Sequence, residues 1–497
     1  MSETFEPQVA VAGGSGIRYG RRAPFHPPSV FPEYPWDRAD VDPENTAYAT
    51  VRDALLLLGL DRARAGSASW NPLGELVRPG DRVVIKPNAV LDHNQAPDES
   101  VFASITHPSV LRAVVDYVVI ALGGRGEVVI ADAPVISSDF EAWRRVMELD
   151  ELVRFYGERG VTIRVLDLRE TTTRWMLGMM PSVWRDARPR DPLGYTDVDL
   201  AERSCLASLD PEQIARVYGA DYRTDDTVRA HSGGRHRYRV SNTVLSADVL
   251  ITVPKLKVHA KVGATLAVKG MVGIIGDKNT IVHHRCGATS VGGDEYPPTV
   301  GWLQAKLHDA RTWLIRNVAA RQTTTCDLAY FTAETTRRAV QELVVRRDTH
   351  ERLGGGSWFG NDTAWRMGPD LLRVAMYARA QQMTLQLQPR RMFVIVDGVI
   401  GGDRNGPLAP RAREAGLVLA GRNAVAVDWV GARLMNIDPA KLKMLATCRA
   451  ASDLSWRGAD RPTILSEDRA VREAWSNRHH LGFELPLGWR GHAEWQP

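Results

Sequence analysis

Short apolar segments that alternate with helical ones place the strongest constraint on how this chain can fold. VVIK, ending at Lys86, EVVIAD, ending at Asp132, and VTIRVL have the length and apolar character of buried strands. A helical pattern separates each pair, since LRAVVDYVVIAL follows His107 and another helix runs to about Tyr156. Strands that alternate with helices predict an α/β fold, in which a mostly parallel sheet is flanked by helices.

The alternation stops and resumes along the chain. It returns in ADVLITVPKLKVH, MFVIVDGVIGG and GLVLA, after which Asn423 is placed to cap the helix AVAVDWVGARLM. We expect an α/β body of two lobes with helical and loop insertions. Its segments are an extended proline-rich arm (1–45), a first α/β lobe (46–169), a polar insertion (170–235), a lysine-rich strand, loop and helix segment (236–295), a helical insertion (296–390), an α/β segment that completes the sheet (391–452) and a C-terminal tail (453–497).

Composition and charge argue against several classes of protein. A net charge of +4 on 497 residues, without a dense basic run, disfavours a nucleic-acid partner. The four cysteines are too far apart for a CxxC metal pattern, and so few are typical of a reducing compartment. The N-terminal residues lack the features of a signal peptide, and no apolar run reaches the roughly 18 residues of a membrane span. We therefore expect a cytoplasmic protein with no membrane partner.

Lysine is distributed unevenly. The chain has nine lysines among 63 basic residues, and five of them lie between Lys255 and Lys278. An ammonium group is a compact charge that can lose its proton when buried, whereas a guanidinium practically cannot. This excess indicates a site that arginine could not form, although a solvated, lysine-rich turn would give the same count.

Polar side chains follow several predicted strands at their carboxyl ends, where ligands bind in open α/β sheets. Any one of them could instead cap a helix or satisfy a loop. Their recurrence favours a shared pocket. Its expected residues are Lys86, Asn88, Asp132, Lys255, Lys257, His259 and Asp397.

The segment PKLKVH is the densest part of this set. If it stays extended, Lys255, Lys257 and His259 alternate by two and lie on one face. Mutual repulsion would lower the pKa of at least one lysine toward the range of a general base. We expect Lys255, Lys257, His259 and Asp397 to carry the catalysis. The expected substrate-binding residues are Lys86, Asn88, Asp132 and Lys269, which lies in a predicted helix over 265–271.

Histidine raises an alternative in which a metal ion takes part. His259, His283 and His284, together with Asp397, offer imidazole and carboxylate ligands. Adjacent histidines usually point apart, however, and the chain has no HxH or HExxH spacing. We predict no cofactor, and a metal ion on these histidines is the alternative.

Taken together, these motifs resemble a known bacterial family. VVIKPNAV, GGRGEVVIADAP, VPKLKVHAKVGATLAVKGMVGIIGDK and IVDGVIGGDRNGPLAPR are similar to segments of the Domain of Unknown Function 362 family, over about residues 80–445. GSWFGNDTAWRMGPDL, residues 356–371, resembles a long subgroup of that family. Some members are fused to ferredoxin-like iron–sulfur modules, but this chain has no matching cysteines. The layout is also similar, as a fold-level analogy, to nickel-dependent lactate racemases.

The resemblance draws attention to the loop GNDTAWR. Asn361, Asp362 and Arg366 offer a donor, a carboxylate and a fork-shaped anion clamp within six residues, and we expect them to bind substrate. The alternative is a helix cap formed by Asp362 and Thr363.

These observations predict an enzyme that binds an anionic small molecule in a lysine-rich cleft and transfers a proton, as in epimerisation, isomerisation or elimination. Two other functions stay open. One is a metal-dependent enzyme with histidine ligands and a racemase-like layout, and the other is a non-catalytic redox or assembly partner.

Overall fold

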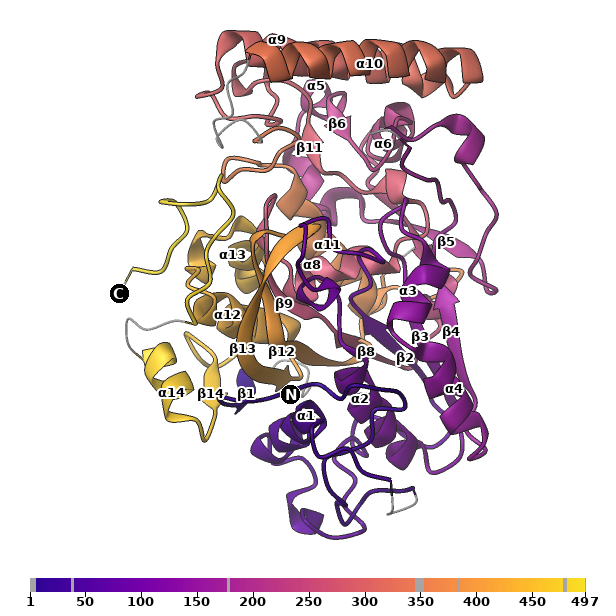
Figure 1. Cartoon of the computed structure of the whole chain (residues 1–497), viewed down its shortest axis with the longest axis vertical. Coiled ribbons are helices and arrows are strands. Elements are labelled where there is room, and N and C mark those ends of the chain that lie inside the picture. Colours follow the sequence, from indigo (N-terminus) through magenta and orange to yellow (C-terminus); the bar gives the residue numbers. More distant parts are fainter. Residues whose placement is uncertain are drawn as a thin grey trace.

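Ten strands form one central sheet in the computed structural model of the chain, which describes residues 6–36, 40–176, 179–344, 353–382, 385–476 and 481–496 (Figure 1). The strands are β1 (Gln8–Gly13), β2 (Arg82–Pro87), β3 (Glu127–Asp132), β4 (Ile163–Asp167), β8 (Val249–Val253), β9 (Lys255–His259), β10 (Gly263–Ala264), β12 (Arg391–Asn405), β13 (Ala409–Gly421) and β14 (Thr463–Leu465). The main path runs β14-β1-β13-β12-β8-β2-β3-β4, while β9 pairs with β12 and β10.

The sheet is mostly parallel, as the alternation of strands and helices predicts. β12, β8, β2, β3 and β4 run parallel to one another, and β13 is antiparallel to both of its neighbours, β12 and β1. Strands from the segments 46–169, 236–295 and 391–452 all belong to this sheet. The α/β fold class is therefore confirmed.

Each face of the sheet has its own core, because successive side chains of a strand point to opposite faces. Val83 and Ile85 of β2 pack with one set of helices, and Val84 between them packs with the other. The first set is α1 (Thr46–Leu57), α2 (Pro108–Leu122), α3 (Phe140–Val146) and α4 (Leu149–Gly157). The second set is α8 (Leu266–Gly270), α11 (Met367–Tyr377), α12 (Ala424–Leu434), α13 (Lys443–Ala450) and α14 (Arg469–Ser476).

Local sequence features account for several of these boundaries. His107 caps α2, with Pro108 at its first position, and Asn423 caps α12 by accepting from the backbone N of Ala426. The helix expected to run to Tyr156 is two helices, because Glu148 between α3 and α4 adopts a positive φ of 48°.

The two insertions pack together beyond the sheet. The polar insertion holds β5 (Tyr195–Asp199), α5 (Pro211–Ile214), β6 (Val217–Tyr218) and α6 (Thr224–Ala230), followed by β7 (Arg237–Ser241) and α7 (Asn242–Leu245). β6 pairs with β11 (His284–Arg285), which ties the polar insertion to the lysine-rich segment. The helical insertion contributes α9 (Trp302–Asn317) and α10 (Thr324–Val344), which lie side by side at one end of the molecule (Figure 1).

Segments near both ends of the chain enter the sheet, which the sequence did not lead us to expect. β1 lies within the segment predicted as an extended arm, and β14 lies within the tail. β1 is short, and its residues Val9 to Ala12 are small or branched apolar residues that bury completely or nearly so. Among the described residues, no helix has the length and apolar character to cross a bilayer.

Candidate functional site

A cavity of about 500 Å³ opens at the carboxyl ends of β2, β3 and β9. This is the edge of a parallel sheet at which α/β proteins bind ligands. The walls come from the strand ends, from α8 and the turns that follow it, from the β6–β11 pair and from the connection between β12 and β13. Segments distant in the sequence therefore line one shared cavity.

The charges that line this cavity are almost all positive. Asp132 is the one carboxylate among the lining residues. The cations are Lys86, Lys257, Lys261, Lys269, Lys278 and Arg311.

Lys86 and Asp132 form a buried ion pair at the floor of the cavity. Lys86 Nζ lies 2.9 Å from Asp132 Oδ1, and Asp132 Oδ2 accepts from the backbone N of Ala89. Gly273 packs so closely on this pair that a Cβ atom there would collide with both side chains. The one carboxylate of the cavity is thus committed to one lysine, and the other cations have no acidic partner within the cavity.

Three further lysines are held by weak or neutral partners. Lys257 Nζ donates to the carbonyl of Ser104 at 2.6 Å, and Lys278 Nζ donates to two backbone carbonyls at 2.6 and 2.8 Å. Lys269 Nζ faces the sulfur of Met367 at 3.8 Å, a weak acceptor. Burial, with the repulsion of neighbouring lysines, lowers the pKa of each of these three lysines to about 7. An entering anion would stabilise their protonated forms.

Two histidines of the cavity present opposite functions to it. His283 Nδ1 lies 2.9 Å from the carbonyl of Gly219, which can only accept, so Nδ1 carries the proton and Nε2 has a lone pair. His259 Nδ1 accepts from the backbone N of Lys261, so its proton lies on Nε2. Burial lowers the pKa of both rings, which keeps them neutral. Neutral His283 can therefore accept a hydrogen bond at Nε2, and neutral His259 can donate one from Nε2–H.

A family model described as "Domain of unknown function (DUF362)" matches residues 83–183 and 196–433, well over half of the chain. The chain belongs to the DUF362 family. The matched DUF362 stretches contain every residue that lines the cavity.

Further relatives are distant. The chain is 22% identical over 374 residues to the thylakoid-associated protein sll1697 of Synechocystis, a match that covers 75% of this chain and 69% of that protein. No solved structure matches the chain.

The structure brings together most of the strand-end residues that the sequence singled out. Those that line the cavity are Lys86, Asn88, Asp132, Lys257, His259 and Lys269. Asn88 Nδ2 is buried without a hydrogen-bond partner among the described residues, which leaves a donor available to a ligand. The amino end of α8, by contrast, is not available to an anion, because the Asp428 carboxylate accepts from its first backbone N–H groups.

Lys255 and Asp397 lie outside the lining of the cavity, in the buried contact that holds the N-terminal arm. Lys255 Nζ is 2.8 Å from Asp397 Oδ2 and donates to the hydroxyl of Tyr19, which itself donates to Asp397 Oδ1. Asp397 Oδ2 also accepts from the backbone N of His107. This placement favours a structural role over the catalytic role expected of these two residues.

Asn361, Asp362 and Arg366 also lie outside the cavity lining. Asp362 pairs with Arg366 at 2.7 Å and with Lys443 at 2.6 Å, so the expected anion clamp is already occupied by a carboxylate of its own loop. Asn361 Nδ2 donates to the backbone carbonyl of His283 at 2.9 Å. The GNDTAWR loop therefore supports the cavity wall from behind.

The alternative metal ligands, His259, His283, His284 and Asp397, do not form one site. Asp397 belongs to the Tyr19 contact, and His283 Nδ1 is engaged with Gly219. His284 faces a different cluster, considered below.

Several cavity residues were missed. Lys261 and Lys278 belong to the lysine excess and could have been named on that ground. Tyr218 and Arg311 come from the two insertions, where the sequence offers no pattern that points to a ligand.

Proposed function

We propose that this chain is an enzyme that binds an anionic small molecule in the lysine-lined cavity and transfers a proton to or from it. The observation that carries the proposal is the charge of the lining, in which five lysines and one arginine face a single carboxylate that is already paired. Arg311 is paired outside the lining, with Glu334 at 3.9 Å. Buried lysines that lack an acidic partner are costly to charge unless a counter-ion occupies the space. Carboxylate or phosphate groups supply that charge and match the ammonium donors.

Different cavity residues would bind the anion, accept the proton and stabilise the developing charge. Lys269 and Lys278 bind the anionic group, because each has an ammonium held only by neutral partners. Lys257, whose pKa of about 7 makes a neutral amine accessible near neutral pH, accepts a proton from the carbon next to that group, and His259 Nε2–H donates a hydrogen bond to the developing oxyanion. Removal of that proton is the first step shared by epimerisation, isomerisation and elimination.

We place this activity in the cytoplasm, without a nucleic-acid partner. The cyanobacterial relative is named as thylakoid-associated. The proposed enzymatic activity rests on the lysine-lined cavity, and it requires no membrane.

A panel of anions tests the proposal while the substrate itself is unidentified. Inorganic phosphate, malate, citrate and phosphoglycerate are added in turn, and protein melting and titration calorimetry report binding. The same acids are then incubated with the protein in D₂O, and proton NMR follows loss of the C–H signal beside the carboxylate. We expect at least one acid to bind and to exchange faster with the protein than without it. Failure of all anions to stabilise the protein would contradict anion binding, and binding without exchange would contradict proton transfer.

Anion affinity should fall as the pH rises above about 7. Lys269 and Lys278 have pKa values of about 7 in the ligand-free protein, and a bound anion raises them, so binding takes up protons. The association constant should be nearly constant well below pH 7 and fall about tenfold per pH unit for each proton taken up above it. Calorimetry between pH 6 and 9, in buffers of different ionisation enthalpy, measures both the association constant and the number of protons taken up on binding.

The variant Lys269→Met provides the control for this pH dependence. It removes one titrating group and keeps a side chain of similar length, so the number of protons taken up should decrease. Affinity that is independent of pH in the unaltered protein would show that the cavity lysines do not bind the anion.

A further inference from the structure

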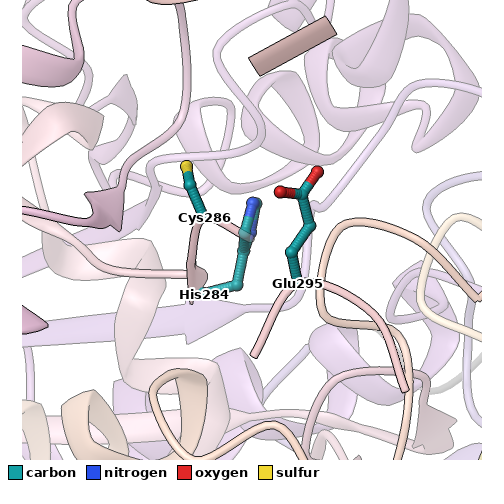
Figure 2. Close-up of side chains that lie close together, drawn as sticks. All are labelled: His284, Cys286 and Glu295. Atoms are coloured by element: carbon teal, nitrogen blue, oxygen red, sulfur yellow. The ribbon is translucent and has the colours of Figure 1, made fainter. Parts of the chain in front are cut away.

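A second cluster of chemically reactive side chains lies beside the lysine cavity. His284, Cys286 and Glu295 are buried, and a potential ligand atom of each lies within 4.8 Å of the other two (Figure 2). Among the residues that the structure describes, no other group of three histidine, cysteine or acidic side chains is so close. Figure 2 shows the His284 ring between the Cys286 sulfur and the Glu295 carboxylate.

The local chain path explains why these three residues meet. His284 and Cys286 are two positions apart on an extended segment that starts at β11, so their side chains leave it on the same side. The chain then reverses, and the backbone N of Glu295 donates to the carbonyl of Gly287 at 3.2 Å. This reversal brings the Glu295 side chain back beside those of His284 and Cys286.

The cluster encloses a small space and is not satisfied by its own contacts. A cavity of about 10 Å³ is bounded by the three side chains together with Tyr218, Arg311, Thr312, Ile315 and Arg316. His284 is 6% exposed, and its Nδ1 has no hydrogen-bond partner among the described residues. Glu295 is 1% exposed. A buried imidazole nitrogen without a hydrogen-bond partner is costly unless another group, such as an ion, completes it.

We propose that His284, Cys286 and Glu295 bind one zinc ion, with a fourth coordination position left open. Imidazole, thiolate and carboxylate are the three ligand types that zinc accepts in proteins, and three protein ligands leave room for a water molecule. The thiolate and the carboxylate together balance the charge of the ion. A soft sulfur ligand in the set disfavours Mg²⁺ and Ca²⁺, which prefer oxygen alone.

The neighbours of the cluster serve as outer-sphere partners. Glu295 Oε2 accepts from the backbone N of Gly287 at 3.0 Å and from the hydroxyl of Thr312 at 3.2 Å, which fixes the carboxylate. His308 Nδ1 lies 3.8 Å from Glu295 Oε1, and Arg316 interacts with the Cys286 sulfur. Contacts of this kind orient metal ligands and stabilise a thiolate.

This metal site lies behind one wall of the lysine cavity. His284, Tyr218 and Arg311 line both spaces. The proposal of a zinc site depends only on its three ligands, so it is independent of whether the lysine cavity binds an anion.

The zinc content of the full-length protein tests the proposal. Protein purified without chelator or affinity metal is dialysed against metal-free buffer and assayed by mass spectrometry for zinc per chain. We expect about one zinc per chain in the unaltered protein and in Cys326→Ser, a matched control in α10. Cys286→Ser and Glu295→Gln should lose at least nine-tenths of it. Less than about 0.1 zinc per chain in the unaltered protein, or undiminished zinc in Cys286→Ser, would overturn the proposal.

A second measurement does not depend on the folding of any variant. The unaltered protein is stripped with chelator and titrated with Co²⁺, which reports a thiolate ligand through a charge-transfer band in the near ultraviolet. We expect this band to saturate at about one equivalent and to disappear on addition of Zn²⁺. A stripped protein that is still folded by circular dichroism and shows no such band would overturn the assignment of Cys286 as a ligand.

Discussion

Lys257→Arg should lower the rate of C–H exchange of a bound acid by about 10²- to 10⁴-fold, the range typical of lost acid–base catalysis. Lys257 is fully buried in the cavity wall, and its Nζ donates to the carbonyl of Ser104 at 2.6 Å. Arginine is larger, and it keeps its proton at a pH where burial brings the pKa of Lys257 to about 7. It can therefore neither occupy the same space nor release a proton. Exchange in D₂O, followed by proton NMR, measures the effect.

The matched control for this substitution is Lys306→Arg. Lys306 lies on α9, and its side chain is 61% exposed, so arginine should be accommodated there with less than about 0.5 kcal/mol change in stability. Exchange by the control should equal that of the unaltered protein. If Lys257→Arg exchanged at the rate of the unaltered protein, Lys257 would have no part in the mechanism. Equal melting temperatures of Lys257→Arg and the unaltered protein would show that any loss of exchange is not due to unfolding.

The sequence predicted much of the cavity because one rule governs where polar residues at strand ends meet. Lys86 and Asp132 end β2 and β3, which pair in parallel, so their side chains come together at the same edge of the sheet. The same rule placed Lys257 and His259 correctly. It says nothing about side chains that reach the edge from insertions, which is why Tyr218 and Arg311 could not be predicted.

The rule failed for Lys255 because β9 does not continue the sheet regularly. Lys255 pairs with Asp397 of β12, but Lys257, two positions on, pairs with Gly402. Five positions of β12 therefore correspond to two of β9, and the simple alternation along a flat strand no longer predicts which residues share an environment. Lys255 consequently meets the N-terminal arm, whereas Lys257 lines the cavity. An irregularity of this kind depends on tertiary packing and leaves no periodic trace in the sequence.

The fold itself was predictable where strands and helices are long and apolar. β1 and β14 escaped detection because each is short and gains its partners only from distant segments: β1 pairs with β13 and β14. The N-terminal arm and the C-terminal tail are thus joined, through β1 and β14, at one edge of the sheet. The N-terminal arm is held a second time, by the buried contact of Tyr19 with Asp397 and Lys255.

Asp397→Asn should lower the free energy of unfolding by about 3 to 5 kcal/mol, the cost of removing one partner from a buried ion pair. Lys255 and Asp397 are both fully buried, and burial lowers the pKa of Lys255 while Asp397 opposes that shift. Asparagine carries no charge, so the Lys255 ammonium would lose its counter-ion and Tyr19 its acceptor carboxylate. Urea unfolding followed by circular dichroism measures the change.

The variant Glu158→Gln is the control, because its side chain is 63% exposed and the nearest guanidinium groups, of Arg154 and Arg159, lie 4.0 and 3.8 Å away. Exposed pairs of this kind contribute no more than about 1 kcal/mol. Because Lys255 and Asp397 lie outside the cavity lining, folded Asp397→Asn should retain anion affinity, measured at low temperature without urea. Unchanged stability combined with lost exchange activity would assign Asp397 to catalysis instead. Reduced stability with retained anion affinity would assign different functions to the two lysines of PKLKVH. Lys255 would hold the N-terminal arm to the sheet, and Lys257 would act in the cavity.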